Sequence, residues 1–231
     1  TAAFGNLSLR PAFSKNYQID YRYKSIGLSA QYSNENDVFA RFSPSINPET
    51  NFVTFSPNNL DQRETLTAII NFPINPSQNW KIRYFTSLSY SEVKGIVDTR
   101  EIDNSITSLR FNMNNNINVT DSFTIQVVGF YQTRQNLNNG GFMRPMGKLD
   151  LSFQKKINDN IILTLNGTNV LNTMKFRPLF ETPELNLIQM ANFNFLKPQA
   201  KLTFTYNFGN RNVKTKTIKT SDESNRIKTS D

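Results

Sequence analysis

The sequence predicts an all-β fold, an antiparallel transmembrane β-barrel segment of about nine strands. Three observations predict it. Apolar and polar residues alternate with a period of two in one segment after another. No run of about 20 consecutive apolar residues exists, which excludes a membrane-spanning helix. The connections between the alternating segments are short and long in turn, as in transmembrane barrels, which have short turns at one end and long loops at the other.

In the N-terminal half, the alternation predicts strands over residues 16–23, 25–42, 64–72 and 80–91. The second of these is one long strand that crosses a polar stretch. The fourth begins at Trp80 and shows the pattern well. Its apolar side carries Ile82, Tyr84, Leu88 and Tyr90, and its polar side carries Lys81, Arg83, Ser87, Ser89 and Ser91.

In the C-terminal half, strands are predicted over residues 108–119, 123–131, 148–154, 161–168 and 199–208. The last one alternates most regularly. One face holds Ala200, Leu202, Phe204, Tyr206 and Phe208, and the other holds Gln199, Lys201, Thr203, Thr205 and Asn207. One face is therefore oily with aromatic ends, and the other is entirely polar.

The predicted connections differ in length in a regular order. Tight polar turns are expected at residues 24–25, 73–79, 120–122 and 158–160, and long irregular loops at 43–59, 94–103, 135–145 and 172–197. A β-sandwich has no reason to sort its loops by length to opposite ends. A transmembrane barrel does this, with short periplasmic turns and long extracellular loops.

The chemistry of the two faces predicts which one meets lipid. The apolar rows carry Tyr, Trp and Phe near their ends, as the aromatic girdles of barrels do at membrane interfaces. The opposite rows carry Asn, Gln, Thr, Lys, Arg and Asp, which suits a hydrated lumen. The alternative is a water-soluble all-β protein, in which the apolar rows would pack inward.

Composition narrows the chemistry. The 231 residues include no histidine and no cysteine, which excludes His-based catalysis and thiol chemistry, and we expect no metal site and no cofactor. Hydrophobic residues make up 37% and the mean hydropathy is −0.50, values that a barrel tolerates because alternate strand residues are polar. The net charge of +8 is spread along the chain, which does not favour nucleic acid. Lipopolysaccharide, periplasmic partners or an anionic substrate fit it better, beside a merely well-solvated surface.

Two parts are expected. Residues 1–208 form the barrel portion, and residues 209–231 form a basic, polar tail with few apolar residues, which we expect to be flexible. The strand count places this tail in the periplasm, on the side of the short turns. The chain opens with Thr1 and lacks a signal peptide, so we expect it to be a segment of a longer precursor.

Several stretches resemble the TonB-dependent receptor superfamily, and together they are most similar to its Bacteroidetes-type outer-membrane β-barrel family. Residues 5–11 (GNLSLRP) followed by 16–21 (NYQIDY) resemble the "NPxLKPE…ELGY" start of a strand in those receptors. Asn59-Leu60 resembles their "N-hydrophobic" motif, although its usual Gly and Glu are absent. Residues 168–173 (TNVLNT) resemble "xNLFN", and 202–209 (LTFTYNFG) resemble the final "LxLxYxFG" strand.

The resemblance implies a cell outer membrane location, a 22-stranded barrel of which this chain would be the last part, and a ligand that crosses when TonB pulls on a plug domain. Neither the plug nor the TonB-binding part is present in these residues. Ligand contact is expected from apolar, aromatic and basic residues of the long loops, namely Phe52, Phe55, Phe142, Met143, Arg144, Phe176 and Phe180. The alternative is that these residues pack the loops against one another. Lumen-facing Arg22, Arg83 and Arg110 are expected to meet plug carboxylates or to guide an anionic substrate.

Two other functions compete with ligand uptake. The barrel could be a non-transporting scaffold in an outer-membrane assembly or secretion complex, with a surface lipoprotein or another subunit as partner, and an ordered tail would favour it. An enzyme is not expected, because a nucleophile needs a positioned base. Without histidine only a carboxylate pair such as Glu181 and Glu184 remains, and two acids in one loop are usually a solvated turn.

Overall fold

The structure is a computed structural model of the chain. It describes residues 2–3, 5–47, 49–50, 52–97, 100–138, 140–182 and 187–208. The predicted tail, residues 209–231, lies outside the described residues. Within them, no helix is long and apolar enough to cross a membrane.

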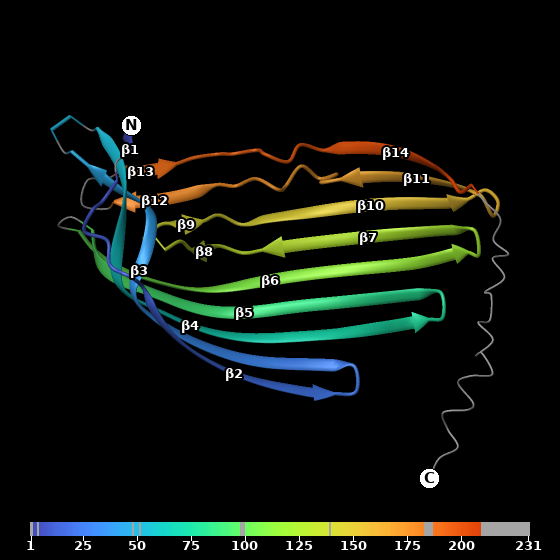
Figure 1. Cartoon of the computed structure of the whole chain (residues 1–231), viewed down its shortest axis with the longest axis horizontal. Helices are drawn as coiled ribbons and strands as arrows, with labels where there is room; N and C mark the ends of the chain where they lie inside the picture. Colours follow the sequence, from blue (N-terminus) through green and yellow to red (C-terminus); the bar gives the residue numbers. More distant parts are fainter. Residues whose placement is uncertain are drawn as a thin grey trace, which may run out of the picture.

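Nine long strands form one curved sheet, in the number that the alternation predicts (Figure 1). Its order is β14-β11-β10-β7-β6-β5-β4-β3-β2, and all neighbours in this order are antiparallel. The short strand β1 (Ala2–Ala3) pairs with β4 in parallel. The nine strands are β2 (Phe13–Tyr23), β3 (Ile26–Ile46), β4 (Val53–Ser77), β5 (Trp80–Val97), β6 (Arg100–Thr120), β7 (Phe123–Gln132), β10 (Met146–Lys156), β11 (Ile161–Thr168) and β14 (Gln199–Tyr206).

A second, smaller sheet continues one end of the first. It has the order β13-β12-β9-β8 and contains β8 (Gln135–Asn136), β9 (Phe142–Met143), β12 (Pro178–Thr182) and β13 (Leu187–Met190). The hairpin β8–β9 connects β7 to β10, and the hairpin β12–β13 connects β11 to β14. The small sheet therefore follows the order of the four long strands below it. The alternation did not reveal these strands, because each is only two to five residues long.

The short turns lie together at the opposite end of the sheet, where Figure 1 shows tight returns between neighbouring strands. They are Lys24-Ser25, Gln78-Asn79, Asp121-Ser122 and residues 157–160. Three of the predicted short turns are confirmed. The predicted turn at 73–79 is wrong in extent, because β4 continues to Ser77 with a register irregularity between Ile74 and Ser77.

Two of the predicted long loops are also wrong. Residues 43–59 are mostly strand, since β3 runs to Ile46 and β4 starts at Val53. Residues 94–103 are mostly strand as well, since β5 runs to Val97 and β6 starts at Arg100. The end that carries the long connections is therefore built from extended hairpins that rise beyond the body of the sheet.

A change of phase in the alternation explains the missed extensions. On β5 the apolar row ends at Tyr90, and the next residues on that face are Glu92 and Lys94. The opposite face changes the other way, from serines to the buried Val93 and Gly95. Beyond the lipid band the outward-facing residues are polar and the inward-facing residues are buried. The period-two pattern therefore continues, but the apolar residues now lie on the inner face.

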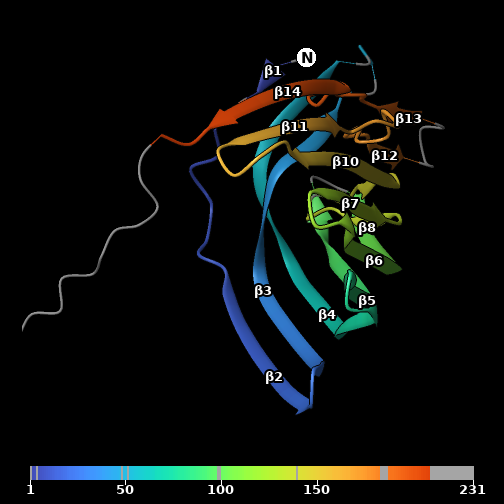
Figure 2. The ribbon, with the colours of Figure 1, turned by 90° about the vertical axis from the view of Figure 1, so that its right-hand side faces the viewer.

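The hairpin β3–β4 bends over the end of the sheet beyond Asp37, whose φ is 52°. Val38, Ala40 and Leu60 then join Val93 and Ile102 in one buried cluster. Figure 2 shows this hairpin arching across to the side of β14 and the small sheet.

The N-terminal segment fixes the bend. The Asn59 amide donates to the carbonyls of Arg10 and Asp37, and its oxygen accepts from the Arg10 amide. Arg10 also forms an ion pair of 2.8 Å with Asp37. Asn6 holds the same segment farther along β4, where it donates to the carbonyl of Pro57. Two stretches of the family resemblance, residues 5–11 and Asn59-Leu60, therefore meet at this corner.

The apolar rows are exposed, as the barrel interpretation predicts and the soluble alternative does not. Ile19 is 75% exposed, Leu66 56% and Leu202 66%, all within the regular part of the sheet. No second layer covers these rows in the described part of the chain, as Figures 1 and 2 show. A water-soluble protein would bury such rows, whereas a barrel wall exposes them to hydrocarbon.

Gly95 offers a test of the close contact between β4 and β5 at the bend. A Cβ at Gly95 would lie 2.7 Å from the Asp61 nitrogen and 2.8 Å from the Leu60 Cα, both backbone atoms. We expect Gly95→Val to lower the free energy of unfolding by about 1–3 kcal/mol, because the backbone must move. Urea unfolding of the intact protein in lipid vesicles measures this. Gly5→Val is the control, because nothing lies within 4 Å of its Cβ position, and equal effects of the two changes would contradict the prediction.

Candidate functional site

The polar face of the sheet is a continuous field of hydrogen-bonding side chains. Across β2 and β3, Ser29 donates to Asp20 over 2.6 Å and Gln31 donates to Gln18 over 3.2 Å. Across β4 and β5, the hydroxyls of Thr67 and Ser89 lie 3.0 Å apart. Such a surface suits a water-filled lumen, because each polar group keeps partners when water is present.

The lumen-facing arginines differ in their surroundings. Arg110 lies over the ring of Phe130, with 5.0 Å between the guanidinium carbon and the ring centroid. Arg22 and Arg83 form no ion pair with any described residue. That Arg22 and Arg83 meet plug carboxylates or guide an anionic substrate stays a prediction.

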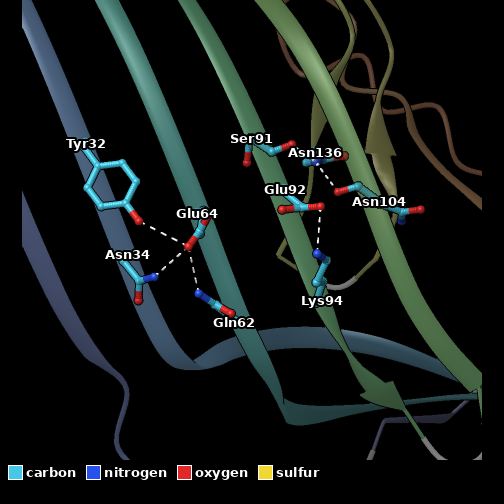
Figure 3. Close-up of polar contacts among 9 residues, drawn as sticks. All are labelled: Tyr32, Asn34, Gln62, Glu64, Ser91, Glu92, Lys94, Asn104 and Asn136. Atoms are coloured by element: carbon cyan, nitrogen blue, oxygen red, sulfur yellow. Dashed lines mark hydrogen bonds and ion pairs between the residues drawn. The ribbon is translucent and has the colours of Figure 1, made fainter.

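Above the apolar band, the Glu64 carboxylate accepts hydrogen bonds from side chains of β3 and β4 on the outer face (Figure 3). Its Oε1 accepts from the Tyr32 hydroxyl at 3.2 Å and from the amides of Asn34 and Gln62, each at 3.0 Å. On the neighbouring strand Glu92 binds Lys94 at 2.9 Å. These contacts mark the level at which the strands leave the lipid band, just above the tyrosines.

The pair of Glu92 and Lys94 lies outside the apolar band and is open to water. The hydrogen bond and the charge of Glu92 raise the pKa of Lys94 above its ordinary value of 10.5. A raised pKa favours the folded state below the unfolded value and loses that contribution as the pH rises past the folded value. The pair therefore persists throughout the physiological range.

Asn136 ties the small sheet to the polar face of the long strands (Figure 3). Its side-chain amide donates to the carbonyl of Ser91 at 2.8 Å and to that of Asn104 at 3.1 Å. The Asn104 amide in turn donates to the Gly140 carbonyl at 2.6 Å, and Arg63 on β4 donates to Asn138. The β8–β9 hairpin is thus fixed inward, over the lumen side.

An aromatic pocket lies between the bent β3–β4 hairpin and the small sheet. Its volume is about 940 Å³, which is in the range of small-molecule sites. Five phenylalanines line it, together with one arginine and two asparagines: Phe39, Phe55, Phe176, Phe180, Phe193, Arg41, Asn136 and Asn138. An apolar wall with a few polar groups is the usual composition of a ligand site.

The structure brings three of the seven predicted ligand residues into this aromatic pocket: Phe55, Phe176 and Phe180. Phe55 comes from β4. The other two come from the long connection between β11 and β14, residues 169–198, which is called the excursion. Phe176 is bridged to Phe193, and their ring centroids lie 6.1 Å apart. Gly141 lies directly behind Phe180, where a Cβ would approach the ring to 2.5 Å.

The other four predicted residues lie elsewhere. Phe52 is 47% exposed and does not line the pocket. Met143 is buried at 3% exposure, and Phe142 lies under the guanidinium of Arg134 at 3.7 Å. Arg144 is exposed and reaches the sulfur of Met190 at 3.8 Å.

Sequence reasoning missed Phe39 and Phe193 as pocket residues. Phe39 stands in the stretch predicted as the regular end of a membrane strand, and the bend at Asp37 carries it over the end of the sheet. For Phe193 a signal existed, since Phe193 and Phe195 alternate in the same excursion as Phe176. Their rings stack with a centroid distance of 5.4 Å.

Asn169 sets the path of the excursion between β11 and β14. It is fully buried and has a φ of 50°. Its side-chain oxygen accepts from the amides of Thr173 and Met174, each at 3.2 Å, and its nitrogen donates to the Leu196 carbonyl. One side chain thus joins both legs of the excursion that carries three of the pocket phenylalanines.

The structure places one of the two acids singled out in the sequence. Glu181 forms an ion pair with Arg134 at 3.4 Å, and Glu184 lies outside the described residues. Among the residues described, no three acidic side chains come together in a way that could hold a metal ion.

Comparison with known proteins gives one family and distant structural neighbours. The model of the outer membrane protein beta-barrel family matches residues 1–206. No curated protein matches the chain significantly. Among solved structures, the siderophore receptor PiuA from Acinetobacter baumannii is 12% identical over 84% of this chain, with a TM-score of 0.48. The chain spans 28% of that receptor's length. OmpT, an outer membrane protein of Vibrio cholerae, is 9% identical, with a TM-score of 0.40, over 77% of this chain and 50% of its own.

Proposed function

The chain belongs to the outer membrane protein beta-barrel family, and we therefore propose that it forms part of the wall of a TonB-dependent-receptor-like transporter that binds a ligand in the aromatic pocket. The observation that carries this proposal is the pocket itself. Phenylalanines from β3, β4 and the excursion between β11 and β14 converge on one cavity of about 940 Å³ at the end of the sheet with the long connections.

The position of the pocket supports uptake rather than simple loop packing. It lies on the side of the polar face, where the Asn136 and Arg63 contacts hold the β8–β9 hairpin. A ligand leaving the pocket would therefore enter the hydrated lumen. In this proposal the long hairpins are extracellular and the short turns face the periplasm. The ligand binds at the extracellular end of the lumen.

The plug and TonB belong to this proposal. A plug domain would fill the lumen, where Arg22 and Arg83 have no ion pair with a described residue and could meet its carboxylates. A charge beside protein is costly without a partner, which favours plug contacts for these arginines. Transport by way of TonB would then need residues beyond those of this chain.

The chemistry of the pocket favours an apolar or aromatic ligand surface. Burying one phenyl ring against a ligand contributes about 1.5–3 kcal/mol. The side-chain nitrogen of Asn138, whose oxygen accepts from Arg63, would supply a hydrogen bond that orients the ligand. We propose no catalytic step, and Glu181, the described acid singled out in the sequence, forms an ion pair with Arg134. The scaffold alternative rests on the tail, which lies outside the described residues.

The test is nutrient uptake by a strain that depends on the intact protein. A deletion strain is grown on limiting iron chelates, cobalamin, oligosaccharides or peptides, and is complemented with the wild-type gene or with Phe180→Ala/Phe193→Ala. We expect the wild type to restore growth on one nutrient class. We expect the double variant to raise the half-saturating concentration at least about tenfold, because two rings are removed from the pocket.

Phe52→Ala is the matched control, since Phe52 lies outside the pocket, and it should behave as wild type. Equal amounts of folded barrel in the outer membrane must be confirmed for each variant. Growth that depends on none of the nutrients, with the barrel bound stoichiometrically to another subunit, would favour the scaffold and overturn the transporter.

A further inference from the structure

A groove opens on the apolar face of the sheet, away from the aromatic pocket. Its volume is about 580 Å³, and it lies over β6, β7 and the start of β10, beside residues 171–177. The register places its floor in the exposed rows: Phe111 pairs with Tyr131 and Tyr131 with Gly147, and Met113 pairs with Gly129 and Gly129 with Leu149. The groove is therefore part of the surface that meets hydrocarbon.

Two glycines lie beneath the groove, and neighbouring groups cover both. At Gly129 a Cβ would lie 2.7 Å from the terminal carbon of Met113, and at Gly147 it would lie 2.9 Å from the Phe130 carbonyl oxygen. The groove is therefore lined by large apolar side chains, namely Phe111, Tyr131 and Leu149, and not by bare glycines.

The end of the groove toward the long hairpins carries positive charge. Lys175 and Arg177 line it, and neither forms an ion pair with a described residue. Arg177 donates one bond to the Pro145 carbonyl at 2.6 Å, and its buried Nε has no partner within the described part of the chain. An anionic group in the groove would give these two cations a counter-charge that no described carboxylate supplies.

We propose that this groove binds a phosphorylated membrane lipid, with one acyl chain against Phe111, Tyr131 and Leu149 and a phosphate on Lys175 and Arg177. An apolar floor with cations at one rim matches the two ends of such a lipid. The cations lie at the loop end of the groove, because the Arg177 carbonyl accepts from the Arg144 amide, beyond the pairing of Gly147 with Tyr131. The headgroup then stays at the interface while the chain follows the wall. This site is independent of the aromatic pocket and of the proposed uptake.

The experiment uses the intact protein, purified and delipidated in detergent. Lipid A, which carries two phosphates, is titrated against it, and bound lipid is counted by native mass spectrometry. Phosphatidylcholine and inorganic phosphate are titrated separately. We expect one tightly bound lipid A per barrel, at least about tenfold weaker retention of phosphatidylcholine, and no measurable effect of inorganic phosphate alone.

Two variants test the cations and the apolar groove separately, and a third is a control. Lys175→Gln/Arg177→Gln should weaken lipid A binding at least about tenfold through the lost charge-assisted bonds. Gly129→Leu should weaken it without changing the charge, because the new side chain displaces Met113 from its place over Gly129 into the groove. Lys197→Gln, an exposed cation of the same excursion, is the matched control and should bind as wild type.

Unchanged binding by either groove variant, with folding confirmed, would overturn the proposal. So would equal retention of phosphatidylcholine, which would show a wall without headgroup selection. Binding of inorganic phosphate as tightly as lipid A would make the place an anion site, and a dimer that covers the groove and excludes lipid would assign it to a second copy.

Discussion

Replacing Asn169 by valine is expected to lower the free energy of unfolding by about 3–5 kcal/mol. Valine cannot accept the hydrogen bonds of the Thr173 and Met174 amides, nor donate to the Leu196 carbonyl. All three backbone groups would lose their partner at a fully buried position, and each such loss costs about 1–3 kcal/mol.

The backbone adds to this cost. Asn169 has a φ of 50°, a conformation that asparagine tolerates and that a β-branched residue strongly disfavours. The consequence extends to the aromatic pocket, since Asn169 joins the two legs of the excursion that carries Phe176 and Phe193. We therefore expect the variant to lose the pocket contacts of these rings before the sheet itself unfolds.

Urea unfolding of the intact protein in lipid vesicles, followed by tryptophan fluorescence, measures the effect. Asn192→Val is the matched control, because Asn192 is exposed on the same excursion and has no positive φ. Its effect should stay within about 0.5 kcal/mol. A small effect of Asn169→Val, equal to that of the control, would show that the excursion does not depend on this side chain.

The sheet could be predicted from the sequence because each long strand repeats one simple signal. Alternation specifies both the strand and its lipid-facing side, and nine segments with the same signal give the sheet. The resemblance also pointed to positions with a physical role. Asn169 and Asn172 of the stretch TNVLNT both have positive φ values, of 50° and 52°. Asn59, from another such stretch, binds the N-terminal segment.

The extended hairpins and the pocket could not be predicted in the same way. Above Tyr90 the faces exchange their character, so the stretch from Glu92 onward reads as irregular although the strand continues. The pocket depends on the bend at Asp37 and on contacts such as Asn136 to Ser91, which join residues 45 positions apart. Three pocket phenylalanines were identified by composition alone, and Phe39 required the bend.

The orientation of the faces can be tested with two neighbouring isoleucines in the middle of β4. Ile70 pairs with Leu28 and Thr86 on the apolar face, and Ile69 pairs with Ser29 and Ser87 on the polar face. We expect Ile70→Arg to lower the free energy of unfolding in lipid vesicles by about 2–4 kcal/mol, the cost of an arginine near the middle of the bilayer. Urea titration of the refolded intact protein measures it.

Ile69→Arg is the matched change, because it places the same side chain one residue away on the opposite face. Its guanidinium would enter a lumen already lined by serine and threonine hydroxyls, so we expect a loss below about 1 kcal/mol. The difference between the two variants depends on lipid, and it should shrink when both proteins are compared in a detergent whose micelle is thinner and more hydrated. The reverse order, with Ile69→Arg the more damaging, would mean that the serine face meets hydrocarbon and that the lumen, the aromatic pocket above it and the lipid groove have all been assigned to the wrong side.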